Sequence, residues 1–411
     1  MPSASGRGRR EFIGATAGGL AALAVGKPHT AIAQAAQNDA VRPGEEYRVA
    51  VIGHTGRGNY GHNVDAVWLD VPGVKIVAVA DRDEAGRARA QQRLAAPAAY
   101  EDYRVMLRRE KPDLVSIAPR WLDQHRDMAL ACAEGRVKGV LMEKPLCRTL
   151  EEADEIVEAC GQTGMKMAIC HQTRYSPRLK VIRDLIAEGR IGNIVEMRCR
   201  GKEDRRGGGE DMMVLGTHLM DLMRFIAGDA RWCFGRVTDA GTPVTKEHVR
   251  EGAEGIGPLA GDAIVAVYGF AEPIAGHFAT HRAEHGAGAR FRLLILGTKG
   301  AISVRTGSLP NAYLLEDPSW TPGESGAQWQ PITSTGVGGE EPLTDSSLRW
   351  GNSLVARDLI ACVEQDRRPL GSVEDGRAAL EMILAVYESH RARAPVALPL
   401  ADRTHPLTRM D

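Results

Sequence analysis

A tripeptide directly after an apolar run carries the residues best suited to proton transfer. Residues 139–142 form an apolar run typical of a buried strand, and Glu143, Lys144 and Pro145 follow it. The carboxyl ends of strands are where open α/β sheets form their ligand crevices. A partly buried lysine there has a lowered pKa and can donate or accept a proton. Without further context, a solvated charged pair at a strand exit fits the pattern equally well.

A glycine-rich turn follows the first predicted strand, residues 48–52. Its six residues are Gly53, His54, Thr55, Gly56, Arg57 and Gly58. The strict dinucleotide fingerprint has glycine at the first, third and sixth places, whereas here threonine takes the third place and a glycine follows it. We expect a helix after the turn, with the backbone N–H groups of Gly56, Arg57 and Gly58 directed at a pyrophosphate.

An acidic residue ends the second predicted strand, residues 75–80. Asp81 occupies the place where a carboxylate accepts hydrogen bonds from the ribose hydroxyls of NAD. The adjacent Arg82 suits the 2′-phosphate of NADP instead, so the choice between NAD and NADP stays open. Asp81 could also serve only as the N-cap of the next helix.

Alternating strands and helices must position these residues. Helices are predicted at 84–94, at 123–133, and from a capping box at 149–152 to about residue 160. Strands are predicted at 48–52, 75–80, 113–118, 139–142 and 166–170. This alternation predicts a parallel sheet with right-handed crossovers, which is a Rossmann dinucleotide-binding domain over residues 45–171.

After about residue 171 the pattern changes. A helix at 177–188 precedes five strand-like runs with few helices between them: 194–199, 263–270, 275–280, 291–296 and 301–304. Residues 317–344 form a surface excursion, and helices at 347–364 and 373–392 close the chain. The predicted fold class is α/β, with a second α/β domain over 172–400 built on a largely antiparallel open sheet.

Composition excludes several classes of function. The 411 residues suffice for two domains, and the formal net charge of -1 gives no basis for a nucleic-acid or anionic-membrane partner. No stretch after the N-terminus is apolar enough to span a bilayer. None of the seven cysteines forms a C-x-x-C pair, so no metal site is expected.

The first 35 residues have the pattern of an export signal. Arg9 and Arg10 precede a Gly- and Ala-rich apolar stretch at 13–25, and 31–33 is a cleavage candidate. This segment resembles a twin-arginine signal, which exports folded proteins. We therefore expect a periplasmic or other extracytoplasmic location and a cofactor that is bound before export.

The order of motifs resembles the glucose-fructose oxidoreductase, inositol dehydrogenase and rhizopine-catabolism (Gfo/Idh/MocA) family, almost end to end. The motifs are the glycine turn, Asp81, Ala118-Pro119, Glu143-Lys144-Pro145, Arg174-Tyr175 and Gly216-Thr217-His218 with Asp221. The resemblance implies NAD or NADP lying against residues 143–145, and a sugar or polyol between the cofactor and His218. It also allows a cis Lys144–Pro145 bond. Further cofactor contacts are implied for Pro119, His125, Glu143, Lys144 and Arg174.

The resemblance also implies catalytic roles. Lys144 would hydrogen-bond the reacting hydroxyl and shuttle its proton, and His218 can do the same work near neutral pH. Asp221, one helical turn further, would orient that ring or contact a substrate hydroxyl. One position departs from the family, because Val214 stands where many members carry an acid–base aspartate. Either Lys144 and His218 suffice, or another group substitutes. The candidates are Asp211, Tyr175 and His171.

Three functions are compatible with these residues. The first is an exported oxidoreductase that keeps NAD(P) bound and oxidises a hydroxyl of a sugar, polyol or glycoside. The second is glycoside cleavage assisted by a bound nucleotide with no net redox change, which Val214 and the charged, Gly-rich segment 202–209 favour. That segment is either a mobile rim that grips substrate or a solvated loop. The third, a sugar-binding protein without activity, is disfavoured by the presence of Lys144 and His218. A homodimer or homotetramer is expected from the resemblance.

Overall fold

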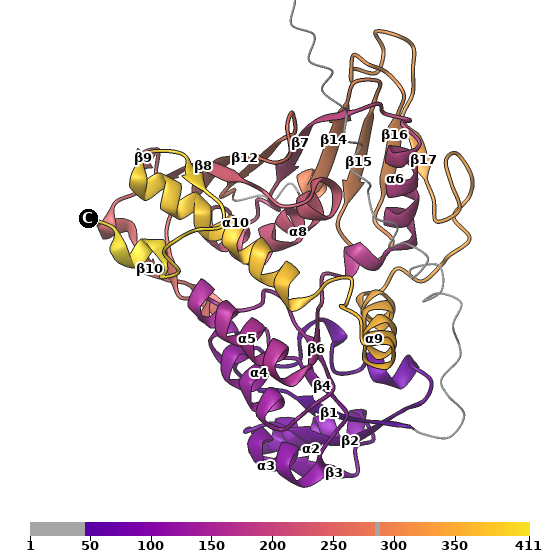
Figure 1. Cartoon of the computed structure of the whole chain (residues 1–411), viewed down its shortest axis with the longest axis vertical. Coiled ribbons are helices and arrows are strands. Elements are labelled where there is room, and N and C mark those ends of the chain that lie inside the picture. Colours follow the sequence, from indigo (N-terminus) through magenta and orange to yellow (C-terminus); the bar gives the residue numbers. More distant parts are fainter. Residues whose placement is uncertain (1–45, 284–287) are drawn as a thin grey trace, which may run out of the picture.

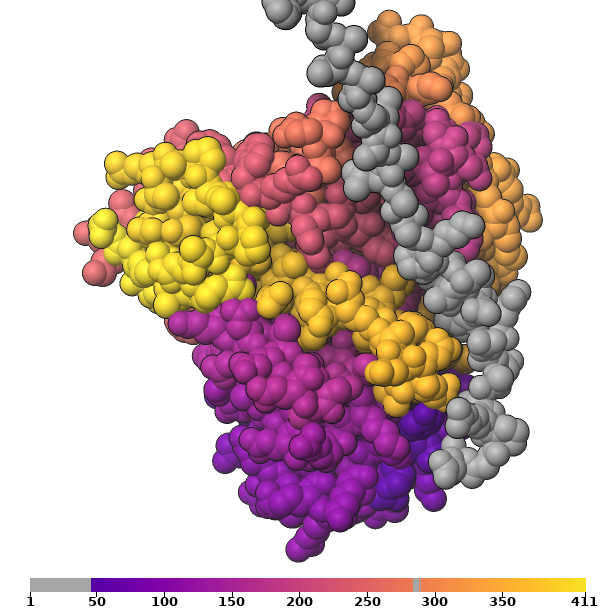
Figure 2. Space-filling model, in the orientation of Figure 1, coloured from indigo at the N-terminus to yellow at the C-terminus, as the bar shows by residue number. Residues whose placement is uncertain are grey.

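A computed structural model of the chain describes residues 46–283 and 288–411, and the predicted export signal lies outside them. Figure 1 shows two domains, with a parallel-sheet domain in indigo and purple below a larger sheet in magenta to orange. In the space-filling view of Figure 2, yellow and golden atoms of the last two long helices lie directly against the purple atoms of the first domain. The two domains are therefore in close contact.

The first domain contains a six-stranded parallel sheet in the order β3-β2-β1-β4-β5-β6. Its strands are β1 Tyr47–Ile52, β2 Val74–Ala80, β3 Ala98–Tyr100, β4 Leu114–Ile117, β5 Gly139–Met142 and β6 Lys166–Ile169. Every side chain of β4 and β5 and the last four of β1 are buried, which is why these runs are mostly apolar. The strand order reverses between β1 and β4, so a ligand crevice is expected at their carboxyl ends. The Rossmann prediction is confirmed.

Helices cover both faces of this sheet. Helices α3 Tyr103–Glu110, α4 His125–Glu134 and α5 Leu150–Thr163 pack on one face, and α2 Glu84–Arg93 lies on the other. Helix α9, Leu348–Gln365, comes from the far end of the chain and packs beside β5 and β6 on the same face as α2. Residues 348–365 therefore belong in space to the first domain, although the sequence analysis assigned them to the second.

No α-helix follows the glycine turn within the described residues, so that prediction was wrong. Two short 3-10 helices, η1 Gly61–Asn63 and η2 Val67–Asp70, connect β1 to β2 instead. Asn59, His62 and Asn63 have φ angles of 53°, 46° and 62°, which an α-helix cannot contain. Helix α9 packs against both 3-10 helices and covers them.

The second domain is built on a large mixed sheet in the order β17-β16-β15-β14-β7-β13-β12-β8-β18, with β9 paired to β8. All of its described pairings are antiparallel except that of β7 with β13, as the prediction of a largely antiparallel sheet required. The strands are β7 Ile194–Arg200, β8 Trp232–Asp239, β9 Thr242–Pro243, β12 Ala263–Gly269, β13 Ala275–His281, β14 Arg292–Gly297, β15 Ala301–Arg305, β16 Ala312–Leu315, β17 Gln330–Ile332 and β18 Val396–Ala397.

Helices cover one face of this sheet and leave the other open. They are α7 Gly209–Val214, α8 Gly216–Ala227 and α10 Val373–Ala392, while α6 Pro177–Ala187 packs near β17. A separate two-stranded hairpin, β10 Arg250–Glu251 with β11 Pro258–Leu259, extends from this domain. On strand β8, alternate side chains are exposed and buried, so the open face meets solvent in this chain.

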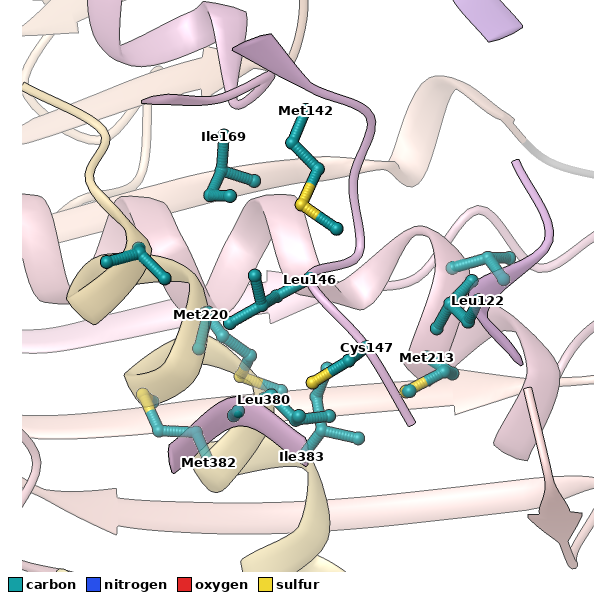
Figure 3. Close-up of a cluster of buried hydrophobic side chains, with 14 of the residues drawn as sticks. Leu122, Met142, Leu146, Cys147, Ile169, Met213, Met220, Leu380, Met382 and Ile383 are labelled. Carbon is teal, nitrogen blue, oxygen red and sulfur yellow. The ribbon is translucent and has the colours of Figure 1, made fainter. Parts of the chain in front are cut away.

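A shared apolar core joins the domains (Figure 3). The first domain contributes side chains around the carboxyl end of β5, and the second contributes side chains from α7, α8 and α10. The labelled members are Leu122, Met142, Leu146, Cys147, Ile169, Met213, Met220, Leu380, Met382 and Ile383. Each is at most 6% exposed. Because interiors are close-packed, this core fixes residues 143–145 against helices α7 and α8.

Candidate active site

The ring of His125 supports the Glu143-Lys144-Pro145 segment through contacts with backbone carbonyl groups. The Lys144–Pro145 peptide bond is cis. The His125 ring is fully buried, with Nδ1 3.0 Å from the carbonyl oxygen of Pro145 and Nε2 2.7 Å from that of Pro119. Both ring nitrogens are therefore engaged with backbone. The predicted cofactor contacts of His125 and Pro119 stay a prediction, and in this structure the His125 ring contacts the carbonyl oxygens of Pro119 and Pro145.

A cavity of about 190 Å³ lies at the junction of the two domains. Glu143 and Lys144 line it from the end of β5, and His218 lines it from helix α8. The structure thus brings together three predicted site residues that are up to 75 positions apart in the sequence. His62, from the loop after β1, lines the same cavity.

Lys144 is a buried amine whose hydrogen-bond partner is a backbone carbonyl. Its Nζ donates to the carbonyl oxygen of Val214 at 3.0 Å. The position that lacks the family's carboxylate therefore still contacts the lysine, through its main chain. Burial lowers the pKa of Lys144, and the nearby Glu143 carboxylate opposes that shift without reversing it. A lysine with a lowered pKa can act as a proton acceptor nearer neutral pH.

His218 is a neutral imidazole directed at the cavity. Burial lowers its pKa well below the ordinary value, and the charges of Lys144 and His171 lower it further. Its Nδ1 has no hydrogen-bond partner within the described part of the chain. His171 lies beside it with the ring centroids 5.5 Å apart in an edge-to-face arrangement. The His171 ring is itself held by Thr217 Oγ1 at 3.1 Å.

Asp221 and Arg174 form a buried ion pair away from the cavity. The Arg174 Nε atom donates to both carboxylate oxygens of Asp221 at 2.8 Å, and Arg174 also pairs with Asp375 at 3.3 Å. Burial opposes ionisation of Asp221, but Arg174 and His171 outweigh it and hold the pKa of Asp221 below its usual range. The predicted contacts of Asp221 with substrate and of Arg174 with cofactor stay predictions, and in this structure the pair fastens α8 to its neighbours. Asp221 orients the ring of His171, 3.2 Å away, rather than that of His218.

The three candidates for replacing the missing aspartate do not line the cavity. Asp211 accepts hydrogen bonds from Thr280 Oγ1 at 2.5 Å and from two backbone N–H groups, and its burial is complete. The Tyr175 hydroxyl accepts from the N–H of Gly371 at 2.8 Å. His171 lies behind His218. All three side chains hold backbone or a neighbouring ring in place.

The segment 202–209 is packed rather than mobile. Its glycines lie against neighbouring backbone, and a Cβ at Gly208 would be 2.3 Å from the carbonyl oxygen of Gly261. Glu203 is buried and pairs with Arg200 and Arg290. Neither alternative, a mobile rim or a solvated loop, describes this segment, because close backbone contact and buried ion pairs hold it.

The glycine turn binds Asp81 internally. The buried Asp81 carboxylate accepts from the Thr55 N–H at 3.0 Å, from the Thr55 hydroxyl at 2.7 Å and from the Tyr60 hydroxyl at 2.9 Å. The N–H of Gly56 donates to Asn59 Oδ1, and that of Arg57 donates to the His54 carbonyl. Two of the N–H groups predicted to meet a pyrophosphate are thus used within the turn.

A second cavity, of about 550 Å³, lies beside this turn at the carboxyl ends of β1 and β2. Its volume is within the roughly 300–1,000 Å³ typical of ligand pockets. The predicted cofactor residues that line it are Gly53, His54, Arg57, Asp81 and Arg82.

The two cavities fit the two ends of a dinucleotide. The larger lies where the strand order predicts the adenosine end, and the smaller lies beside Glu143, whose Oε2 is a buried acceptor without a partner among the described residues. Gly53 is required at the turn, because a Cβ there would be 2.1 Å from the Tyr60 ring.

His62 is the residue of this site that the sequence analysis missed. Its Nδ1 lies 2.7 Å from Glu143 Oε1, and its carbonyl oxygen accepts from Asn352 Nδ2 at 2.9 Å. The predicted helix would have placed His62 on a helix face. The glycines and asparagines around it, Asn59, Gly61 and Asn63, were the available signal that this stretch is not helical.

Two family models match most of the chain. The model of an oxidoreductase family with an NAD-binding Rossmann fold matches residues 47–171. The model of that family's C-terminal alpha/beta domain matches residues 183–398. Together they cover the two domains seen in the structure.

Several sugar-related proteins are similar to this chain. A D-apiose dehydrogenase of Paraburkholderia graminis is 29% identical over 184 residues, 42% of this chain and 48% of the relative. A glycosyl hydrolase family 109 protein of Saccharopolyspora erythraea is 26% identical over 262 residues, 59% of this chain and 51% of the relative. The chain thus matches about half the length of these curated relatives. A levoglucosan dehydrogenase solved with NADH and levoglucosan has a TM-score of 0.69 at 18% identity, covering 87% of this chain and 100% of that one, which shows a shared fold.

The described residues offer neither a metal site nor a membrane-spanning helix. Between residues 46 and 411, with 284–287 left aside, no group of three His, Cys, Asp or Glu side chains is arranged to hold a metal ion. No helix in the same part of the chain is long and apolar enough to cross a membrane.

We predict that acid destabilises the protein through two buried histidines. Burial lowers the pKa of His405 to about 4, and that of His218 falls well below its ordinary value. Unfolding exposes both to water, where a histidine has a pKa of about 6.5. Between about pH 6.5 and 4 the unfolded chain therefore binds more protons than the folded chain. The free energy of unfolding consequently decreases as the pH is lowered, by up to ~1.4 kcal/mol per pH unit for each histidine.

Urea denaturation at a series of pH values measures this slope. His405→Gln should reduce it, whereas His281→Gln, which changes an exposed histidine, should leave it unchanged. Equal slopes in wild type and His405→Gln would contradict the prediction.

Proposed function

We propose that this chain, which belongs to the Gfo/Idh/MocA oxidoreductase family, oxidises a hydroxyl group of a sugar, polyol or glycoside. The hydride of the carbon that bears that group would pass to NAD(P). The observation that carries this proposal is the cavity in which Lys144 and His218 meet beside the cofactor motif. The D-apiose and levoglucosan dehydrogenases among its relatives support a carbohydrate substrate.

The cavity residues can handle the proton of such a reaction. Lys144, with its lowered pKa, is placed to accept the hydroxyl proton, and the Val214 carbonyl at 3.0 Å orients its Nζ. The neutral His218 can accept a hydrogen bond from the same hydroxyl at its unpartnered Nδ1 or from a neighbouring one. A bound nicotinamide would take the hydride from the carbon that bears the hydroxyl.

The charges around the larger cavity favour NAD over NADP. Five carboxylates line it, and three arginines, Arg57, Arg82 and Arg104, accompany them. Arg57 is already paired with Asp123. A 2′-phosphate would bring added negative charge among the carboxylates, which costs free energy. The carboxylates are Asp81, Glu101, Asp102, Asp123 and Asp127.

Glycoside cleavage assisted by bound NAD is the second candidate. The similarity to a glycosyl hydrolase family 109 protein and the absence of a carboxylate at Val214 both favour it. In that reaction the hydride returns to the product, so no net redox change occurs. The two candidates therefore differ in whether the bound nucleotide stays reduced when no second substrate is supplied.

We further propose that the hairpin of residues 250–259 retains the cofactor. Its tip lies against the first domain, where Glu254 pairs with Arg120 at 3.6 Å and Gly255 packs on Asp123. Asp123 in turn pairs with Arg57 at the rim of the larger cavity. The export signal predicted over residues 1–35 would place the protein outside the cytoplasm, where a lost nucleotide is not replaced from a pool.

The first experiment identifies the nucleotide and the reaction. Mass spectrometry of the purified holoprotein should show NAD, and a panel of sugars and glycosides should include one that reduces it. Lys144→Met should slow that reduction by about 10²- to 10⁴-fold, the usual contribution of acid–base catalysis, without loss of bound nucleotide. Lys180→Met, at a half-exposed helix position, is the matched control. A holoprotein without nucleotide, or one unaffected by every compound, would refute the proposed function.

Shortening the hairpin should release the cofactor. Replacing residues 252–257 with two glycines removes the contacts to Arg120 and Asp123, so dissociation should accelerate by about tenfold, equivalent to ~1.4 kcal/mol. The same replacement of the exposed residues 321–326 is the control. Gel filtration followed by absorbance of the retained nucleotide measures the loss. Equal retention in both variants would contradict a role for the hairpin.

We also propose that the open sheet face forms a homodimer or homotetramer interface. Val265, Phe234 and Tyr313 are 58%, 45% and 41% exposed on this sheet, and its cavity of about 970 Å³ includes Val265 and Tyr313. Exposed apolar groups gathered in one place are typical of protein interfaces. Light scattering should give a mass of two or four chains, and Val265→Glu should lower it. A wild-type mass of one chain would exclude the assembly.

A further inference from the structure

The buried cavity raises the question of how a proton leaves it. Lys144 is 8% exposed, His218 is 7% exposed and Glu143 is 1% exposed. A proton that Lys144 takes from a substrate must be passed to water before the amine can accept another. The Nζ of Lys144 is bonded to the Val214 carbonyl, which can accept a hydrogen bond but cannot carry the proton onward.

His62 connects this cavity to solvent. Its side chain is 36% exposed, yet its Nδ1 lies 2.7 Å from the buried Oε1 of Glu143. The other carboxylate oxygen of Glu143 is buried without a partner among the described residues, and Glu143 and Lys144 line the same cavity. The Lys144 amine is bonded to the Val214 carbonyl and not to Glu143, so a water in the cavity would carry the proton between them. Once protonated, the Glu143 carboxyl group can turn and donate that proton to the His62 ring beside it.

The position of His62 is fixed by the fold. Its backbone has a φ of 46°, a conformation that costs a non-glycine residue free energy. The Asn352 side chain of helix α9 donates to the His62 carbonyl at 2.9 Å and holds this loop against the first domain. A strained backbone that a second element holds in place is typical of functional positions.

The charged groups around Glu143 are consistent with transfer through it. His62, Lys144 and His125 surround the carboxylate, and together they hold the pKa of Glu143 below its usual value although burial opposes ionisation. Glu143 is therefore ionised at rest and can accept a proton transiently. His125 is bonded to backbone carbonyls on both sides, which leaves His62 as the neighbour with a solvent-exposed ring.

We propose that His62 and Glu143 form the proton relay of this site, carrying the proton of the oxidised hydroxyl from Lys144 to solvent. This inference rests on the proposed oxidoreductase function. In the step, the substrate O–H bond breaks and its proton goes to Lys144, while the hydride of the same carbon goes to the oxidised nicotinamide. The electron pair left on oxygen completes the carbonyl. Lys144 then returns to the neutral amine as its proton passes by way of a cavity water to Glu143, whose carboxyl group turns and donates it to His62, and His62 releases it to bulk water.

Proton release can be measured separately from hydride transfer. The probe is the panel sugar that reduces the bound nucleotide fastest, mixed with holoprotein in weak buffer that contains a pH indicator. In wild type, release should keep pace with nucleotide absorbance. In His62→Gly, which suits the positive φ, release should lag by about 10²-fold, and added imidazole should restore it because the position is open to solvent.

Two further variants separate a relay from a structural role. Glu143→Gln should give the same lag, and the double variant should be no slower than either single one, since both residues act in one path. His281→Gly, at an exposed position, should show no lag. Release that keeps pace with reduction in His62→Gly, or a lag that imidazole does not shorten, would overturn the relay.

If no panel compound reacts, the proposed function is refuted but the relay is not yet tested. A measurement without any sugar then tests the relay by itself. A relay requires that the proton on the His62 ring exchange with solvent, and ¹⁵N NMR of histidine-labelled holoprotein detects that exchange directly. A ring N–H protected from exchange would exclude the relay whatever the substrate.

Discussion

The burial of two adjacent charged side chains, Glu143 and Lys144, is the constraint on which the rest of this structure depends. Removing a charge from water is costly unless partners compensate for it. The chain supplies these partners from distant segments: the Val214 carbonyl from the end of α7 and the His62 ring from the loop after β1. Met142 and Leu146, on either side of residues 143–145 in the chain, lie in the apolar core between the domains (Figure 3). The pKa shifts of the site therefore follow from the contact between the domains.

Local sequence patterns predicted those helices and strands whose start, end and apolar pattern are encoded in their own residues. The capping box at Thr149 begins helix α5, with the Glu152 N–H donating to the threonine hydroxyl, and the apolar runs form the parallel strands. The loop after β1 was mispredicted because its covering helix is supplied from 290 residues further along, where Asn352 of α9 bonds to His62. This contact between α9 and the loop is tertiary, and no window of local sequence contains both partners.

The candidate site was predicted in part for a related reason. Motifs located Glu143, Lys144 and His218, because each follows a strand or opens a helix at the junction. Motifs do not show which neighbour a buried polar group selects. Asp221, three residues after His218, is bonded to Arg174 and lies 3.2 Å from His171 instead of lining the cavity. Buried polar groups bond to whatever partner the packing supplies, and that partner is set by the three-dimensional fold.

A proton relay and a retained cofactor together bear on which reaction the site performs. In redox-neutral cleavage, the proton and the hydride taken from a hydroxyl both return to the product, so Lys144 could hold its proton until the cycle closes. In net oxidation the product leaves first, and the buried lysine must be deprotonated again for the next hydroxyl. A partly exposed imidazole bonded to the buried Glu143 provides an exit for the proton, which net oxidation requires and redox-neutral cleavage does not. The geometry of His62 thus favours net oxidation, with a second substrate that reoxidises the bound nucleotide in place.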